Sequence, residues 1–281
     1  MSDLSKLCIH SITTKPWGLR EVATKYAAAG VAGISVWQDA VASFKDGHRA
    51  AGEMFRSEGI DVVSYVRGGF YTALEGAGRL KAVDDNKRII DEAAAMGAPL
   101  VVLVCGATPG QSLFESRKQI TDGIAGTIQH ASDAGVKLGI EPLHPMYADS
   151  RSAVNTMSQA NAICDEVGHS HLGITADVFH IWWDDRLEEE IKIAGEKNRL
   201  FSFHICDWKN LPEDMLNDRG LMGEGVIDIS GIRRWVNETG FSGYDEVEIF
   251  SNKYWAMDQD DYLCQIIDAY KSLSQRVKLN N

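Results

Sequence analysis

The 281-residue sequence lacks the features that mark several large classes of protein. No apolar run reaches the roughly 18 residues of a membrane span, and residues 1–6 lack the charged and then apolar form of a signal peptide. The five cysteines are widely scattered and include no Cys-x-x-Cys pair, so neither a disulfide framework nor a zinc knuckle is indicated. These absences predict a soluble, reduced, cytoplasmic protein with no membrane partner.

The chain also has fewer basic residues than acidic ones. The chain has 28 Lys and Arg against 40 Asp and Glu, which gives a formal net charge of −12. It has no basic stripe that could displace counterions from a nucleic-acid backbone, so we expect no nucleic-acid partner. No Gly-x-Gly-x-x-Gly turn or Walker A motif follows a candidate strand, which argues against a doubly wound nucleotide-binding sheet.

Short apolar runs alternate with longer segments of helical period along the whole chain. The run at 101–104 is apolar on both faces, as in parallel strands covered by helices. The candidate strands are 7–12, 33–37, 61–66, 100–104, 137–142, 172–177, 200–206 and 245–250. The candidate helices lie near 18–29, 40–58, 84–96, 112–134, 151–167, 185–197, 229–239 and 258–275. Eight strand–helix units predict an α/β fold: a single-domain (β/α)8 TIM barrel over residues 1–281.

Ionisable side chains stand at the ends of the last four candidate strands. They are Glu141, Asp177, His204 and Glu248, and strand ends form the catalytic mouth of a TIM barrel. Each one alone could be a salt-bridged or hydrogen-bonded core residue, but three carboxylates together would repel one another. The set therefore predicts one divalent cation, with Mn²⁺, Mg²⁺, Co²⁺ and Zn²⁺ all compatible with these ligand types. Glu246 lies on the same strand face as Glu248 at a different depth, which makes it a candidate supporting group.

With these motifs the sequence resembles the sugar phosphate isomerase/epimerase superfamily, also called the xylose isomerase-like TIM barrels. The resemblance covers essentially the whole chain. Its most specific parts are Ile140-Glu141-Pro142, Asp177-x-x-His180, Phe203-His204, Gly223-Glu224-Gly225-x-x-Asp228 and Val247-Glu248-Ile249-Phe250.

In ketose 3-epimerases of this family, the matching Glu, Asp, His and Glu bind one divalent metal. The resemblance thus implies a site made by Glu141, Asp177, His204 and Glu248, with Mn²⁺ as the first expectation. It also implies that the two glutamates are the acid/base pair and that His180 contacts substrate. Those epimerases typically carry Asn at the position of His144 in this chain.

The same superfamily includes apurinic endonucleases, which hold three zinc ions with extra histidine ligands from earlier strands. Here the third and fourth candidate strands end without a histidine, in Val66-Arg67-Gly68-Gly69 and Val104-Cys105-Gly106-Ala107. The loop after the seventh strand reads Asp218-Arg219-Gly220, with glycine where the second ligand of that loop would stand. One metal is therefore expected, not three.

The strand ends also carry candidate substrate contacts. Six of the seven tryptophans fall there, at Trp17, Trp37, Trp182, Trp183, Trp208 and Trp255. They could stack on sugar rings or flat apolar groups, plug the barrel top or form a subunit contact. The residues that we expect to contact substrate are His180, Trp37, Trp182, Asp207, Lys209 and Arg219. His144 is a candidate base, and His10 on the first strand could face the barrel interior. Because basic residues are not clustered, a sugar without phosphate is favoured.

The leading hypothesis is a metal-dependent isomerase or epimerase that removes a proton next to the carbonyl of a keto sugar and forms an enediolate. Glu141 and Glu248 would flank the substrate, with His180 steadying the developing charge. One alternative is a lyase that cleaves 3-keto-glycosides, including C-glycosides, by β-elimination; His144 would be its base, and a small second subunit is then implied. Another is a non-catalytic sugar-binding or partner subunit. The resemblance also suggests a homo-oligomer.

Overall fold

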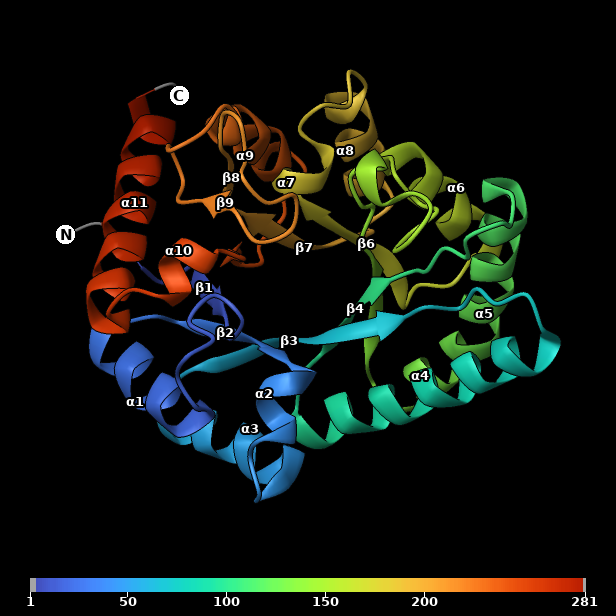
Figure 1. The fold of residues 1–281 in the computed structure, drawn as a ribbon, viewed down its shortest axis with the longest axis horizontal. Helices are drawn as coiled ribbons and strands as arrows, with labels where there is room; N and C mark the ends of the chain where they lie inside the picture. Colours follow the sequence, from blue (N-terminus) through green and yellow to red (C-terminus); the bar gives the residue numbers. More distant parts are fainter. Residues whose placement is uncertain (1–3, 280–281) are drawn as a thin grey trace.

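Parallel strands close into a barrel in the order β1–β10–β7–β6–β5–β4–β3–β2. The computed structural model describes residues 4–279, and the side chains of residues 4–275. The barrel strands are β1 (Leu7–His10), β2 (Gly33–Trp37), β3 (Asp61–Gly69), β4 (Leu100–Val104), β5 (Lys137–Ile140), β6 (Leu172–Asp177), β7 (Leu200–Ile205) and β10 (Asp245–Val247). Figure 1 shows the helices as an outer ring around these strands. The predicted (β/α)8 barrel is confirmed.

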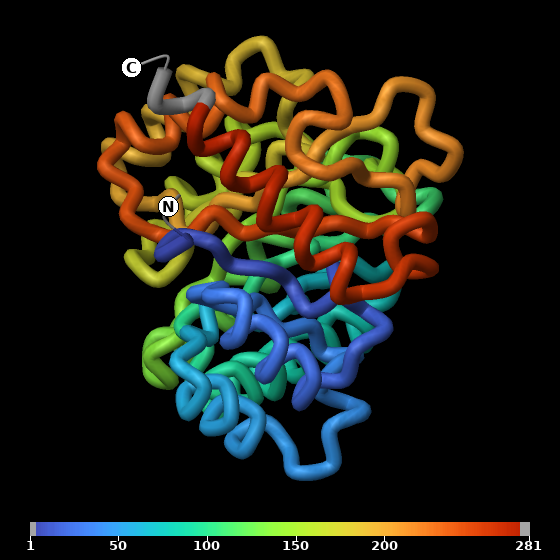
Figure 2. Tube along the Cα trace, turned by 90° about the vertical axis from the view of Figure 1, so that its left-hand side faces the viewer, coloured from blue at the N-terminus to red at the C-terminus, as the bar shows by residue number. Residues whose placement is uncertain are grey.

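The outer ring consists of long helices, and short helices follow several strands on the side of the barrel mouth. The long ones are α1 (Leu19–Ala29), α3 (Gly47–Ser57), α4 (Gly76–Met96), α5 (Leu113–Asp133), α6 (Met157–Val167), α8 (Leu187–Glu196), α9 (Ile229–Glu238) and α11 (Gln259–Leu279). The short ones are α2 (Gln38–Ala42), α7 (Val178–Ile181) and α10 (Asn252–Trp255), with a 3-10 turn over Pro145–Tyr147. In Figure 2 the N-terminal segment runs beside α11, and Lys25 of α1 binds Asp260 of α11 at 2.6 Å.

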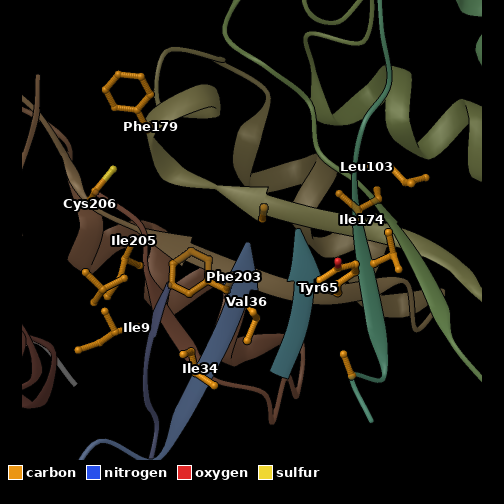
Figure 3. Close-up of a cluster of buried hydrophobic side chains, with 14 of the residues drawn as sticks. Ile9, Ile34, Val36, Tyr65, Leu103, Ile174, Phe179, Phe203, Ile205 and Cys206 are labelled. Atoms are coloured by element: carbon orange, nitrogen blue, oxygen red, sulfur yellow. The ribbon is translucent and has the colours of Figure 1, made fainter. Parts of the chain in front are cut away.

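The apolar residues of β4 alternate between two cores, as the pleat requires. In β4, Val101 and Leu103 pack in the large core between strands and helices, part of which Figure 3 draws. Leu100 and Val102 instead form a small cluster with Val66 inside the barrel. This double burial explains why the strand is apolar on both faces.

Part of the barrel interior is polar. Ser35 of β2 and Ser202 of β7 both donate hydrogen bonds to Glu246 of β10. Ser202 bonds to Glu246 from the neighbouring strand, whereas Ser35 reaches it across β1, which separates β2 from β10 in the barrel. All three side chains are buried. A polar layer therefore lies inside the barrel below the ends of its strands.

Some predicted elements differ from the structure where the chain turns without a strong signal. The predicted helix 40–58 is divided into α2 and α3. Gly47, the first residue of α3, has a φ of 80°, which is outside the helical range and separates the two helices. Helix α4 begins at Gly76, earlier than the predicted 84. Gly76 and Gly78 weaken the helical pattern of the sequence, so the prediction missed the first turns of this helix. Helix α6 begins at Met157, later than the predicted 151, where Thr156 accepts a hydrogen bond from the N–H of Gln159 as an N-cap.

The long connection after β7 is ordered by a small hairpin. Strands β8 (Asp207–Trp208) and β9 (Arg219–Gly220) pair antiparallel.

Within the part of the chain that the structure describes, no helix combines the length and hydrophobicity needed to span a membrane.

Two helix glycines give a test of the packing between helices. A Cβ built on Gly52 of α3 would lie 1.9 Å from the carbonyl oxygen of Met96, whereas one on Gly126 of α5 would lie 3.5 Å from Val83. We expect Gly52→Ala to lower the free energy of unfolding by about 1–3 kcal/mol or more, because backbone must move. Gly126→Ala should raise it by about 0.5–1 kcal/mol. Urea unfolding measures both, and equal effects would contradict this packing.

Candidate metal centre and active site

The four predicted ligands come together at the barrel mouth. Glu141 follows β5, Asp177 ends β6, His204 lies in β7 and Glu248 follows β10, and these strands are consecutive neighbours in the barrel. Each side chain offers a ligand atom, and these atoms all lie within 4.8 Å of one another. All four side chains are buried. The geometric convergence that the strand ends predicted is therefore present.

The atoms at the centre of this cluster suit a cation. Glu141 Oε1 and His204 Nδ1 lie 3.1 Å apart, at ion-pair distance, and no third residue of the described chain hydrogen-bonds to either atom. Buried polar atoms are usually paired, so such atoms need an explanation. Three carboxylates and one imidazole are a donor set that divalent metals accept. The residues present thus fit a single divalent metal.

Arg219 of β9 brings a guanidinium group into direct contact with two of the predicted ligands. Its Nη1 donates to Asp177 Oδ2 at 2.9 Å and to Glu248 Oε2 at 2.8 Å. The guanidinium carbon lies 4.3 Å from the centre of the Phe179 ring and 5.0 Å from that of Phe250. The side chain is only 3% exposed. Two aromatic rings and two carboxylates therefore hold this cation in one orientation.

His180 and Arg219 present hydrogen-bond donors to the same space. The backbone N–H of His144 donates to His180 Nδ1 at 3.3 Å, which places the ring proton on Nε2. Burial first, and then the charge of Arg219, hold the pKa of His180 well below its ordinary value, so the ring is neutral. His180 Nε2 lies 3.2 Å from Arg219 Nη2. In the tautomer that accepts the His144 N–H, both atoms carry protons and an oxygen of a bound ligand would accept from both; in the other tautomer Arg219 Nη2 donates to Nε2.

Charged neighbours and burial set the protonation of the ligand cluster. Burial raises the pKa of Asp177 to about 7. Burial lowers the pKa of His204, but Glu141 and other carboxylates outweigh it and raise that pKa to about 10. Burial also raises the pKa of Glu248, but His10 and Arg219 outweigh it and hold that pKa well below its ordinary value. Glu248 is therefore anionic at neutral pH, whereas His204 carries a proton that a metal must displace.

This pattern predicts that metal affinity rises with pH. Between about pH 7 and 10 a metal would displace one proton, from His204, and below about pH 7 it would displace a second, from Asp177. We expect the logarithm of the Zn²⁺ association constant to rise with a slope near one above pH 7 and steeper below it. Calorimetry in buffers of different ionisation enthalpy counts the protons released. Affinity that is flat between pH 6 and 9 would contradict this ligand set.

The side chain of His10 faces the barrel interior, as the sequence allowed for this residue of the first strand. Its Nδ1 lies 3.1 Å from Glu248 Oε1 and its Nε2 lies 3.4 Å from Glu246 Oε2. Trp37 covers it, with the indole nitrogen 3.2 Å from the same Nδ1. Burial lowers the pKa of His10, but Glu248 and Glu246 outweigh it and raise that pKa. The sequence signalled only its strand face, because the depth and partners of His10 depend on the register of three strands.

His144 lies beside an aromatic wall at the mouth. Its ring is 4.9 Å from that of Trp208 and 6.0 Å from that of Trp183, while Trp208 stacks on Phe179 at 4.8 Å. Trp182 adds a further ring, 5.7 Å from Trp208. Burial lowers the pKa of His144, so its imidazole is neutral near pH 7, and its Nδ1 accepts a hydrogen bond from the backbone N–H of Met146 at 3.3 Å. Phe179 was not singled out from the sequence, because nothing in its immediate neighbourhood distinguishes it from a core residue.

The structure places Asp207 and Lys209 in contacts of their own loop. Asp207 is buried and accepts hydrogen bonds from the backbone N–H groups of Trp208, Gly223 and Ile227 at 2.9–3.0 Å. Lys209 Nζ lies 2.5 Å from Asp218 Oδ1. Neither is in the ligand cluster, so contact of these two residues with substrate stays a prediction.

The fold and the site together define a class of protein: a (β/α)8 barrel with an acidic and histidine cluster where its last four strands end. The model of the family described as "Xylose isomerase-like TIM barrel" matches residues 23–272. The chain belongs to this family, as the resemblance of its motifs indicated.

Individual relatives agree with this placement. The crystal structure of protein SMc04130 from Sinorhizobium meliloti 1021 is 41% identical, with a TM-score of 0.92 over 96% of this chain and 99% of that one. The inosose isomerase of Halalkalibacterium halodurans is 26% identical over 196 residues, which cover 68% of this chain and 67% of that protein. A crystal structure of the IOLI protein with a bound zinc atom has the same fold: 23% identity and a TM-score of 0.85 over 97% of this chain and 99% of that one.

Proposed function

We propose that the protein is a divalent-metal-dependent isomerase or epimerase of a keto sugar, which removes and returns a proton next to the carbonyl. The observation that carries the proposal is the cluster of Glu141, Asp177, His204 and Glu248, with two further donors aimed beside it. The name of the inosose isomerase supports isomerase chemistry, and the zinc atom in the IOLI structure supports a divalent metal. From the resemblance, Mn²⁺ is the first expectation for the resident ion.

The four ligand residues would hold the metal, which when bound would act as a Lewis acid toward a substrate carbonyl and its neighbouring hydroxyl. Glu141 and Glu248 extend from β5 and β10, which β6 and β7 separate in the barrel wall. A substrate between them would meet one carboxylate on each side. One carboxylate removes the proton next to the carbonyl, and the other returns a proton to the opposite face or to the neighbouring carbon.

His180 and Arg219 act on the charge that proton removal creates. The enediolate carries more negative charge on its oxygens than the keto sugar does. The Nε2–H of His180 and the Nη2–H of Arg219, 3.2 Å apart, would donate to one such oxygen. Donors that are already oriented need no rearrangement when the charge forms, which is the basis of electrostatic catalysis.

A specific observation favours lyase chemistry as the second candidate. His144 is a neutral imidazole beside the wall formed by Trp182, Trp183, Trp208 and Phe179. Trp183 is 38% exposed, so this wall reaches the surface. A flat apolar aglycone could stack there while His144 assists its departure after the shared first step.

Proton NMR in D₂O separates these functions. The protein is loaded with diamagnetic Mg²⁺ or Zn²⁺ and incubated with a panel of ketohexoses and 3-keto-glycosides. Deuterium beside the carbonyl together with a new sugar isomer is the expected result. Deuterium incorporation with release of the aglycone would assign a lyase instead. No incorporation with any substrate would leave non-catalytic sugar binding as the function.

A further inference from the structure

We infer that Glu246 and His10 are positioning residues that hold Glu248 and His204 in the geometry needed for metal binding. The inference rests on the metal site of the proposed function, but not on any substrate. Neither residue belongs to the ligand set of Glu141, Asp177, His204 and Glu248 that the family resemblance implies. Both contact that set from inside the barrel.

The carboxylate of Glu246 is fixed by serines from strands on either side of its own. Ser202 of β7 donates to its Oε1, and Ser35 of β2 donates to its Oε2 at 2.6 Å. Strand register supports this placement, because Glu246 pairs with His204 on β7 and with Cys8 on β1. The side chain is 1% exposed. A carboxylate buried this deeply is costly unless a donor or a cation compensates it, so its remaining neighbours are informative.

Those neighbours are two imidazole nitrogens. Glu246 Oε2 lies 3.4 Å from His10 Nε2 and 3.7 Å from His204 Nε2. Neither nitrogen forms a hydrogen bond with any residue of the described chain, so both face Glu246 at ion-pair distance. The two rings meet edge to face, with centroids 4.4 Å apart. One fixed carboxylate thus faces both histidines.

For His204, this contact lies on the side opposite the metal site. Its Nδ1 is 3.1 Å from Glu141 Oε1 and 3.9 Å from Glu248 Oε2, whereas its Nε2 points toward Glu246. Histidines that ligate a metal usually donate their other N–H to a carboxylate, which fixes the tautomer and the ring orientation. Glu246 is the carboxylate that faces this N–H, at 3.7 Å; an approach to hydrogen-bond distance when metal binds would fix the ring and leave Nδ1 free for the metal.

His10 transmits the same constraint to Glu248. Its Nδ1 lies 3.1 Å from Glu248 Oε1, while Glu248 Oε2 is held by Arg219 at 2.8 Å. The two carboxylate oxygens therefore face separate partners, and rotation of the side chain would lengthen at least one of these contacts. Because Glu246 faces the other ring nitrogen of His10, the order Glu246–His10–Glu248 forms a connected line from the polar layer to the metal site.

The test uses Glu246→Gln and His10→Asn in the full-length protein, loaded with Co²⁺. Glu246→Gln keeps the size of the side chain but removes its charge, and His10→Asn removes the bridge to Glu248. Replacing a residue that contacts a metal ligand commonly lowers metal affinity by 10–100-fold. We expect each variant to weaken Co²⁺ binding at least tenfold in competition with a chelator. The visible absorption band of bound Co²⁺ should also shift, because it reports ligand geometry.

Asp245→Asn is the matched control. Asp245 is the preceding residue of the same strand and is also buried, but it binds Arg233 and Tyr270 and does not belong to the ligand cluster. Its replacement should lower stability and leave the Co²⁺ affinity and spectrum unchanged. If Glu246→Gln does not fold, Ser35→Ala combined with Ser202→Ala releases the same carboxylate and should change the spectrum in the same direction.

Co²⁺ affinity within twofold of the parent protein and an unchanged band in the Glu246 and His10 variants would overturn the inference. Equal losses in Asp245→Asn would overturn it as well, because the effect would then be general destabilisation. These readouts do not depend on turnover. A protein that binds Co²⁺ but converts no sugar would refute the proposed function and still test the two positioning residues.

Discussion

Replacing either Glu141 or Glu248 with glutamine is expected to lower kcat by roughly 10²–10⁴-fold, the usual contribution of a positioned acid or base. The amide keeps an oxygen that can face the metal but cannot take up a proton. The measurement is deuterium exchange into the keto sugar at saturating metal, with the metal content of each variant determined in parallel. Metal content separates loss of the base from loss of the ion.

Glu213→Gln provides the control for this prediction. Glu213 lies exposed on the loop between β8 and β9, so removal of its charge should change kcat by less than about twofold. Variants of Glu141 and Glu248 that retain a tenth or more of the parent activity while fully loaded would show that neither glutamate moves the proton. His144 would then become the leading candidate for the base.

Arg219→Met should have opposite effects on stability and metal affinity. In the metal-free protein, Arg219 neutralises Asp177 and Glu248, which are both buried. Breaking a buried ion pair on one side typically costs 3–5 kcal/mol, and we expect a loss of about this size in the free energy of unfolding. A bound metal would supply the missing positive charge, so the loss should be smaller in the Zn²⁺-loaded protein. By linkage, Zn²⁺ should then bind the variant more tightly.

Urea unfolding with Zn²⁺ and with a chelator measures both states. Arg233→Met is the control, because Arg233 pairs with the buried Asp245 away from the ligand cluster. Its loss of stability should be the same with and without metal. An Arg219→Met variant that behaves in the same way would show that Arg219 holds its carboxylates equally well when metal is bound. In either case turnover should fall, since one of the two donors beside the site is gone.

The barrel could be predicted from the sequence because each of its units has its own periodic signal. The strands at 33–37, 100–104 and 172–177 have the predicted bounds, since apolar runs buried on two sides begin and end abruptly. Helix boundaries were harder to predict where glycine or a polar cap decides them, as at Gly47 and Thr156. A periodic pattern shows which face is buried, but it does not show where the last turn unwinds.

The ligand cluster could be predicted for a similar reason. Strand ends that follow one another in the sequence are neighbours in a barrel, so their side chains meet without any knowledge of loop structure. Arg219 was expected near the substrate, but its contact with Asp177 and Glu248 depends on a hairpin that only the folded chain defines. The contacts of His10 depend on strand register, which the sequence leaves open.

Anomalous diffraction from crystals soaked in Zn²⁺ tests the central claim most directly. We predict one zinc peak per chain, about 2.0–2.2 Å from an oxygen of Glu141, Asp177 and Glu248 and from Nδ1 of His204. Arg219 should then have given up at least one of its contacts with Asp177 and Glu248. A zinc peak elsewhere, or no peak with Arg219 still bound to both carboxylates, would contradict a metal centre at this mouth.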